Sequence, residues 1–161
     1  MRPRARHRLK KSEVRRIVEG IRETIGFDIA LFLKSVTVEI AEFTDHTILL
    51  VDGVASFFEL GDGFFVPTLR GVMKFEISGK RVVVDAGAVR FIVNGADVMG
   101  PGIVESDEQI NIDDVVVVVD ERHGKPLAIG RALKKGDDIR SSGKAVKSLH
   151  YVGDKIWNLE L

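Results

Sequence analysis

The stretch Val84-Asp-Ala-Gly-Ala-Val-Arg-Phe-Ile-Val-Asn-Gly-Ala-Asp-Val-Met-Gly-Pro-Gly-Ile103 is the most informative part of this 161-residue sequence. Residues 86–93 predict a short helix, and Asn94-Gly95 is typical of the left-handed turn that ends one. In the second half, three glycines and one proline surround Met99. Glycines leave backbone N–H groups accessible, so this loop predicts the close approach of a phosphate or a base. The alternative interpretation of the same residues is a tight turn that only reverses the chain.

The sequence before this stretch predicts one helix on an antiparallel sheet. Ser12 is the expected N-cap of a helix with apolar residues at helical spacing, and Gly26 is its expected end. Further along, the apolar period changes to two, Asp52-Gly53 predicts a hairpin turn, and Pro67 predicts the end or the edge of a sheet. The strands expected from this pattern are 36–41, 47–51, 54–60 and 64–66.

The sequence after residue 80 predicts a small, partly closed barrel of short strands. Residues 67–80 are expected to form a junction, with a domain boundary near 76–80 that divides 1–78 from 79–161. The five consecutive valines Val115–Val119 predict a strand that is buried on both faces. Gly130 is expected to allow a close approach to the backbone. The other expected strands are 82–85, 126–133 and 144–152, with 155–159 completing a last hairpin.

Positive and negative charges are distributed unevenly along the chain. The 24 basic and 24 acidic residues give a formal net charge of zero. Residues 1–16, a basic N-terminal tail, nevertheless carry a net charge of +7, residues 17–78 carry −6, and residues 122–155 carry +6. Basic clusters attract phosphate backbones, so the two ends favour a nucleic-acid partner over a neutral one.

Several functional classes are disfavoured by what the sequence lacks. The absence of Cys excludes disulfides, thiolate nucleophiles and Cys-ligated zinc. The four histidines are scattered, no Walker A motif or nucleophile elbow is present, and Asp113-Asp114 and Asp137-Asp138 lie in turn-like contexts that favour solvated acids. No segment approaches the ~20 apolar residues of a membrane span, and no apolar core follows the basic start, so no signal peptide is expected.

At this point the residues show a family resemblance. The stretch Val84–Ile103, together with 125–130 and 147–157, resembles a PUA domain, the RNA-binding module of pseudouridine synthases and archaeosine transglycosylases. Residues 50–58 and 65–70 resemble the pre-PUA domain of the malignant-T-cell-amplified-sequence family. The resemblance covers nearly the whole chain except residues 1–8. It implies an α+β fold, with an N-terminal helix on an antiparallel sheet (pre-PUA) followed by a C-terminal PUA pseudo-barrel.

The resemblance also implies which residues contact RNA. PUA domains hold RNA with the glycine loop after the first helix and with the final strands. Carried onto this chain, backbone N–H groups and basic side chains would bind phosphates, and apolar loop atoms would contact a base or ribose. Lys144 and Lys147 are three residues apart, so on a regular strand they point to opposite faces unless a bulge intervenes. Tyr151 and Trp157 are expected to pack rather than to stack on bases. The implied RNA-binding residues are Arg90, Gly95, Ala96, Met99, Gly100, Pro101, Gly102, Ile103, Arg131, Lys144 and Lys147.

The family is linked to translation on the small ribosomal subunit and carries no catalytic residues, and its eukaryotic members act with a density-regulated partner. The resemblance therefore implies a cytoplasmic, non-enzymatic protein without a cofactor that binds structured RNA, either tRNA or ribosomal RNA. A translation factor or ribosomal protein is a further expected partner. The lack of Cys, the many Val and Ile, and the Arg-rich start look more like an archaeal member.

Two alternatives remain open from the sequence. One is an RNA-binding specificity subunit for an RNA-modifying enzyme whose catalysis lies in another chain. The other is a protein-interaction adaptor that docks a basic ribosomal protein or factor on the acidic middle of the chain.

Overall fold

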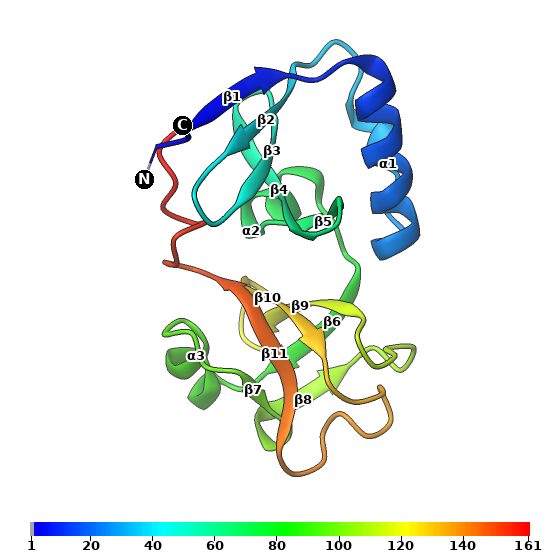
Figure 1. The fold of residues 1–161 in the computed structure, drawn as a ribbon. Coiled ribbons are helices and arrows are strands. Elements are labelled where there is room, and N and C mark those ends of the chain that lie inside the picture. The colour runs from blue at the N-terminus through cyan, green and yellow to red at the C-terminus, as the bar shows by residue number, and fades with distance from the viewer. Residues whose placement is uncertain (1) are drawn as a thin grey trace. The chain divides into compact units, whose positions relative to one another are not determined.

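The computed structural model describes residues 2–161, which form two compact units (Figure 1). The first unit extends to Ile77 and also includes Asn158–Leu161, and the second is Ser78–Trp157. The first contains a five-stranded sheet in the order β1-β2-β3-β4-β5, and the second a six-stranded sheet in the order β7-β11-β10-β9-β6-β8. The predicted architecture, α+β with a helix on an antiparallel sheet followed by a second unit built on a curled sheet, is confirmed.

The sheet of the first unit is antiparallel throughout. Asp52 and Gly53 both have positive φ, 49° and 77°, which is the geometry of the tight hairpin turn predicted there. Pro67 ends the edge strand β5, as expected of a residue without a backbone donor. The strands are β1 (Ala5–Arg8), β2 (Val38–Glu42), β3 (Thr47–Val51), β4 (Val54–Gly61) and β5 (Phe64–Pro67).

The helix α1 (Lys11–Ile25) is amphipathic, buries Val18 and Ile21, and ends at Gly26, whose φ is 69°. The prediction of Ser12 as its N-cap is wrong. The N-cap is Lys10, and its backbone N–H donates to Glu13 Oε1 at 3.2 Å. The Glu13 side chain therefore accepts a backbone N–H group at the start of the helix, as the glutamate of a capping box does.

The predicted junction 67–80 contains a second helix, α2 (Leu69–Phe75), that was not predicted. A 3-10 turn earlier in the chain, η1 (Ile29–Phe32), was also not predicted. Thr68 caps α2, because its Oγ1 accepts from the Gly71 N–H at 2.9 Å. A Cβ on Gly71 would lie 1.9 Å from the Ser56 carbonyl oxygen, so the glycine lets α2 pack directly on β4. Such a short helix shows too little periodicity in the sequence to be distinguished from a loop.

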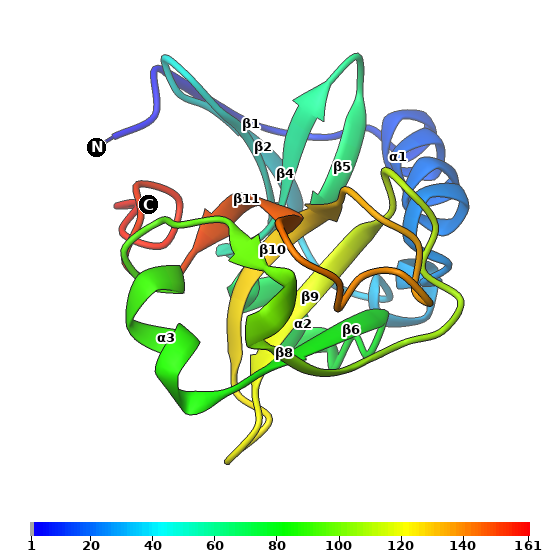
Figure 2. The same cartoon turned by 90° about the horizontal axis from the view of Figure 1, so that it is seen from below.

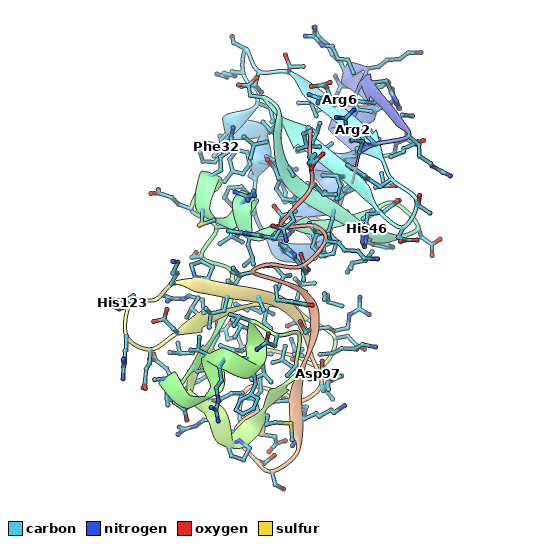
Figure 3. All side chains as sticks on the ribbon, turned by 90° about the vertical axis from the view of Figure 1, so that its left-hand side faces the viewer. Arg2, Arg6, Phe32, His46, Asp97 and His123 are labelled. Atoms are coloured by element: carbon cyan, nitrogen blue, oxygen red, sulfur yellow. The ribbon has the colours of Figure 1, made fainter. Side chains whose placement is uncertain are left out.

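Part of the predicted basic tail is a strand. Ala5 to Arg8 pair with Glu42 to Glu39 of β2, and Arg6 binds Glu39 through Nε at 2.9 Å and Nη2 at 3.1 Å (Figure 3 labels Arg6). All four side chains of β1 are exposed, so the strand shows no apolar alternation. Charged residues on an edge strand are a usual protection against pairing with other chains.

The sheet of the second unit curls into a half-barrel (Figure 2). Its centre is β9 (Val115–Asp120), which pairs antiparallel with β10 and parallel with β6 and buries Val116 to Val119, as predicted. A Cβ on Gly130 would lie 2.3 Å from Val146 Cγ1, which confirms the predicted close approach. The other elements are β6 (Lys80–Val84), α3 (Ala86–Ile92), β7 (Val98–Met99), η2 (Gly100–Gly102), β8 (Ile103–Ser106), β10 (Pro126–Ala132) and β11 (Lys144–Tyr151).

Two predictions for this unit are wrong. The expected loop 96–103 contains β7 and η2, and the expected last strand 155–159 is a series of turns. The reason for the second difference is Asp154, whose carboxylate accepts the backbone N–H groups of Tyr151 at 3.0 Å and Trp157 at 2.8 Å. These bonds fold the segment back locally instead of leaving its N–H groups for a sheet partner.

Candidate nucleic-acid interface

Three neighbouring strands, β7, β11 and β10, bring several of the predicted site residues together. Lys144 on β11 is opposite Met99 on β7, and Lys147 on β11 is opposite Arg131 on β10. The pairing with β7 shifts register between Lys144 and Val146, so β11 carries the irregularity that the sequence left open. Lys144 and Lys147 are both exposed, and Met99 is 47% exposed. The geometry therefore places one apolar and three basic side chains on adjacent strands.

Arg131 and Lys147 form a pair of like charges across two strands. Within residues 2–161, neither has an acidic partner, and Arg131 Nε is buried without a hydrogen-bond acceptor. Like charges directly opposite each other in a sheet are unfavourable, and a buried donor without an acceptor costs further free energy. A bound anion would relieve both costs.

Lys144 differs from these two because it has an acidic partner that sequence analysis missed. Its Nζ lies 3.3 Å from Asp97 Oδ2, and Asp97 Oδ1 accepts the Ser148 N–H at 2.9 Å (Asp97 is labelled beside β11 in Figure 3). Asp97 lies inside the stretch 84–103 but pairs with a residue far along the chain, so no local pattern indicated it. The Asp97 carboxylate holds the loop against β11 and reduces the positive charge at this end of the strand.

The glycines of the loop pack against protein. Gly100 is buried, its N–H donates to the Gly143 carbonyl at 2.9 Å, and an added Cβ would lie 1.7 Å from the Ser141 carbonyl oxygen. The Gly95 N–H donates to the Ile92 carbonyl at 3.0 Å, and the Gly102 carbonyl accepts from Asp85. The expectation of open N–H groups does not hold for Gly95 and Gly100. Their geometry favours the alternative interpretation, a turn that needs small residues to pack closely.

The remaining predicted residues divide by exposure. Ile103 is only 2% exposed and belongs to the hydrophobic core, so its side chain is not part of the surface. Ala96 and Pro101 are exposed, and Gly102 is half-buried. Tyr151 packs against the core, as predicted.

On α3, Arg90 forms an aromatic contact that the sequence analysis did not anticipate. Its guanidinium lies over the ring of its neighbour Phe91, 4.7 Å from the centroid, and Phe91 is 55% exposed. Exposed aromatic rings and guanidinium planes are the surfaces on which unpaired RNA bases stack. An Arg-Phe pair on a short helix is the sequence signal that could have pointed to Phe91.

The buried His150 pairs with Asp154 at the end of β11. His150 is 1% exposed, and its Nδ1 lies 2.9 Å from Asp154 Oδ2. Burial by itself raises the pKa of Asp154, but the hydrogen bond and charge of His150, together with the Trp157 and Tyr151 N–H groups, outweigh it. The pKa of Asp154 therefore lies below its usual range, and the pair stabilises the turn after β11.

No group of three or more metal-ligating His, Cys, Asp or Glu side chains occurs in the part of the chain that the structure describes. Among the same residues, no helix is long and apolar enough to span a membrane.

Comparison with known proteins first defines the class. The family model of the PUA domain matches residues 80–152, and that of a domain of unknown function, DUF1947, matches residues 5–75. A hypothetical protein from the hyperthermophilic archaeon Pyrococcus horikoshii has the same fold, with a TM-score of 0.83 and 40% identity, covering 95% of this chain and 98% of that one. This is a PUA-domain protein with a DUF1947 domain before the PUA domain.

Relatives then define the family. An uncharacterized protein of Methanocaldococcus jannaschii is 44% identical over 159 residues, 98% of both chains. Human malignant T-cell-amplified sequence 2 is 31% identical over 133 residues, 79% of this chain and 74% of the relative. Translation machinery-associated protein 20 of Eremothecium gossypii is 36% identical over 104 residues, 60% of this chain and 58% of the relative. The chain belongs to the malignant T-cell-amplified sequence family.

Proposed function

We propose that this protein is a non-enzymatic RNA-binding protein that acts in translation by binding tRNA or the small ribosomal subunit. In this proposal residues 79–161 are the RNA-binding PUA domain and residues 1–78 the pre-PUA domain. The PUA match over residues 80–152 and the name of the Eremothecium gossypii relative, a translation machinery-associated protein, support it.

The observation that carries the proposal is the pair Arg131–Lys147. Two cations face each other on adjacent strands without an acid between them, and one has a buried donor without an acceptor. A phosphate group supplies the negative charge and the acceptor oxygens that this pair lacks. Because the pair lies in a PUA domain, we infer that this phosphate belongs to an RNA backbone.

The neighbouring surface suits the rest of a nucleotide. Met99, opposite Lys144, offers an exposed apolar contact for a base or ribose. Arg90 and Phe91 on α3 offer a stacking surface. Lys144 would exchange its exposed ion pair with Asp97 for a phosphate contact at little cost, because such pairs are weak in water. Gly100 and Ile103 are left out of the proposed contacts because they are buried.

The experiment is filter binding of tRNA over a series of salt concentrations. Lys147→Gln and Arg131→Gln are each expected to weaken binding and to reduce the slope of log affinity against log salt by about one. Lys125→Gln, in the exposed turn between β9 and β10, is the matched control and is expected to leave the slope unchanged. Equal effects of all three substitutions, or no tRNA binding at low salt, would contradict the proposal.

A second variant tests the loop without removing a cation. Gly102→Glu adds a carboxylate next to the proposed contacts, and its Cβ would lie 3.3 Å from Ala88 Cβ, a tight but local contact. We expect this variant to stay folded and to lose tRNA binding by charge repulsion. Retained tRNA affinity would exclude the loop from the interface. Deletion of the basic residues 1–11 is a less suitable test of RNA binding, because it also removes strand β1 and the start of α1.

A further inference from the structure

The first unit contains an open groove of about 1010 Å³ beside α1. The helix α1 lies next to the edge strand β5 (Figures 1 and 2). One wall is a stripe of α1 at helical spacing that includes Glu13, Arg16, Gly20 and Glu23. The other wall comes from the sheet and β5. We call this feature the α1–β5 groove, lined by His7, Leu9, Ser12, Glu13, Arg15, Arg16, Ile17, Glu19, Gly20, Glu23, Ile40, Glu42, Thr47, Glu59, Asp62, Gly63, Phe64 and Phe65.

The lining of the α1–β5 groove is predominantly acidic. It contains six carboxylates and two arginines, and of the carboxylates only Glu19 has an ion pair, with Arg22 outside the groove. Glu23, Glu42, Glu59 and Asp62 have no basic partner among residues 2–161. This surface repels phosphate and attracts lysine and arginine side chains.

Apolar side chains accompany these charges. Glu42 is opposite Thr47 and Glu59 is opposite Phe65, so the acidic row crosses the sheet toward β5. Beside that row, Phe64 is opposite Gly61, lines the groove and is 56% exposed, although it is a large aromatic residue. An exposed aromatic residue within an otherwise polar rim is the arrangement that anchors an apolar side chain of a protein partner.

Gly20 is the second unusual feature of the groove. It lies in the middle of α1 and has no positive φ, and a Cβ at this position would meet no atom within 4 Å. Glycine weakens a helix interior, and here neither the backbone conformation nor the packing of the free protein requires it. A partner that lies close to the helix backbone would require it.

We propose that the α1–β5 groove binds a lysine- and arginine-rich segment of a partner protein, with an apolar side chain of that segment at Phe64 and its backbone close to Gly20. The site lies in the first unit and does not depend on RNA binding by the second. It gives the acidic part of the sequence a defined place at which a basic partner docks.

The test uses the full chain and a short fluorescent peptide of lysine, leucine and glycine, with a twin in which glutamate replaces lysine. Fluorescence anisotropy is expected to show binding of the basic peptide, weakened by salt, and no binding of the acidic twin. In the variant Gly20→Gln, a long side chain extends from the helix into the groove. Because glutamine favours helix more than glycine, this variant is expected to melt at a higher temperature and to bind the basic peptide at least about tenfold more weakly.

Charge variants locate the peptide. Glu23→Lys, in the groove, is expected to weaken binding, whereas Asp45→Lys, an equal charge change at an exposed position outside the groove, is expected to leave it nearly unchanged. Equal effects of these two variants, or wild-type affinity in Gly20→Gln, would overturn the proposal. It would also be overturned if Gly20→Gln abolished tRNA binding or a self-association of the chain, since either result would assign the groove to a different occupant.

Discussion

At the scale of single residues, Asp154 shows how one side chain determines the local structure. It accepts two backbone N–H groups and pairs with the buried His150, so it replaces the sheet partner that residues 155–159 lack. The sequence pattern predicted a last hairpin with a strand at 155–159, whereas the structure has turns there. The hydrogen bonds of a single carboxylate decided between these outcomes, and no periodicity in the sequence reports them.

Asp154 also predicts a dependence of stability on pH. Because its pKa is lower in the folded chain than in the unfolded one, its ionised form stabilises the fold above about pH 4 and this contribution disappears as the pH falls through the folded pKa. We expect Asp154→Asn to be about 1–3 kcal/mol less stable than the wild type at neutral pH. On acidification, the free energy of unfolding of this variant is expected to fall less than that of the wild type.

Urea unfolding followed by the fluorescence of Trp157, the only tryptophan, measures this directly. Asp137→Asn, at an exposed position, serves as the control and is expected to unfold like the wild type at neutral and at acidic pH. An unchanged acid sensitivity in Asp154→Asn would exclude the His150–Asp154 pair as its source.

At the scale of elements, the strands with apolar alternation or a continuous valine run were predictable, and so were α1 and α3. The segments that were missed lack such a pattern. β1 exposes all its side chains, β7 has two residues, and α2 depends on Gly71 packing on the Ser56 carbonyl. For the candidate interface, the sequence pointed to residues that lie on β7, β10 and β11, but the Arg131–Lys147 register and the Asp97 contact depend on pairing across the sheet.

The strand β1 gives a prediction at this scale. Its removal by deletion of residues 2–8 takes away the Arg4 N–H that the Glu42 carbonyl accepts, and it turns β2, with the buried Ile40 and Ala41, into a sheet edge. Exposed edges of this kind pair with other chains. We expect the deletion variant to self-associate, as measured by light scattering, and to lose hydrogen-exchange protection in β2.

The matched variant keeps the strand and removes only its ion pair. Arg6→Gln breaks the contact with Glu39, and since exposed ion pairs contribute at most about 1 kcal/mol, we expect a monomer of nearly unchanged stability. Self-association of Arg6→Gln would attribute the effect to charge rather than to the open edge.

At the scale of the whole molecule, a net charge of zero combines strongly basic and strongly acidic segments. Oppositely charged regions of different molecules attract one another when salt is scarce, and a protein without net charge has no overall repulsion to oppose this. We expect the protein to associate weakly at about 10 mM salt and to disperse at about 150 mM, where screening limits charge interactions to short range.

Static light scattering over that range measures this association. Asp45→Lys, which raises the net charge at an exposed turn, is expected to reduce the association at low salt. Association that grows with salt would indicate apolar rather than electrostatic contacts.

The four residues Asn158–Leu161 determine what a proteolytic cut between the two units would leave. They belong to the first unit although they follow the second one in the chain, so the second unit is an insertion within the first and is joined to it by two covalent crossings. A single proteolytic cut between Ile77 and Ser78 would therefore give two fragments, and residues 158–161, which stay covalently attached to the second unit, would hold it to the rest of the first unit by noncovalent contacts alone.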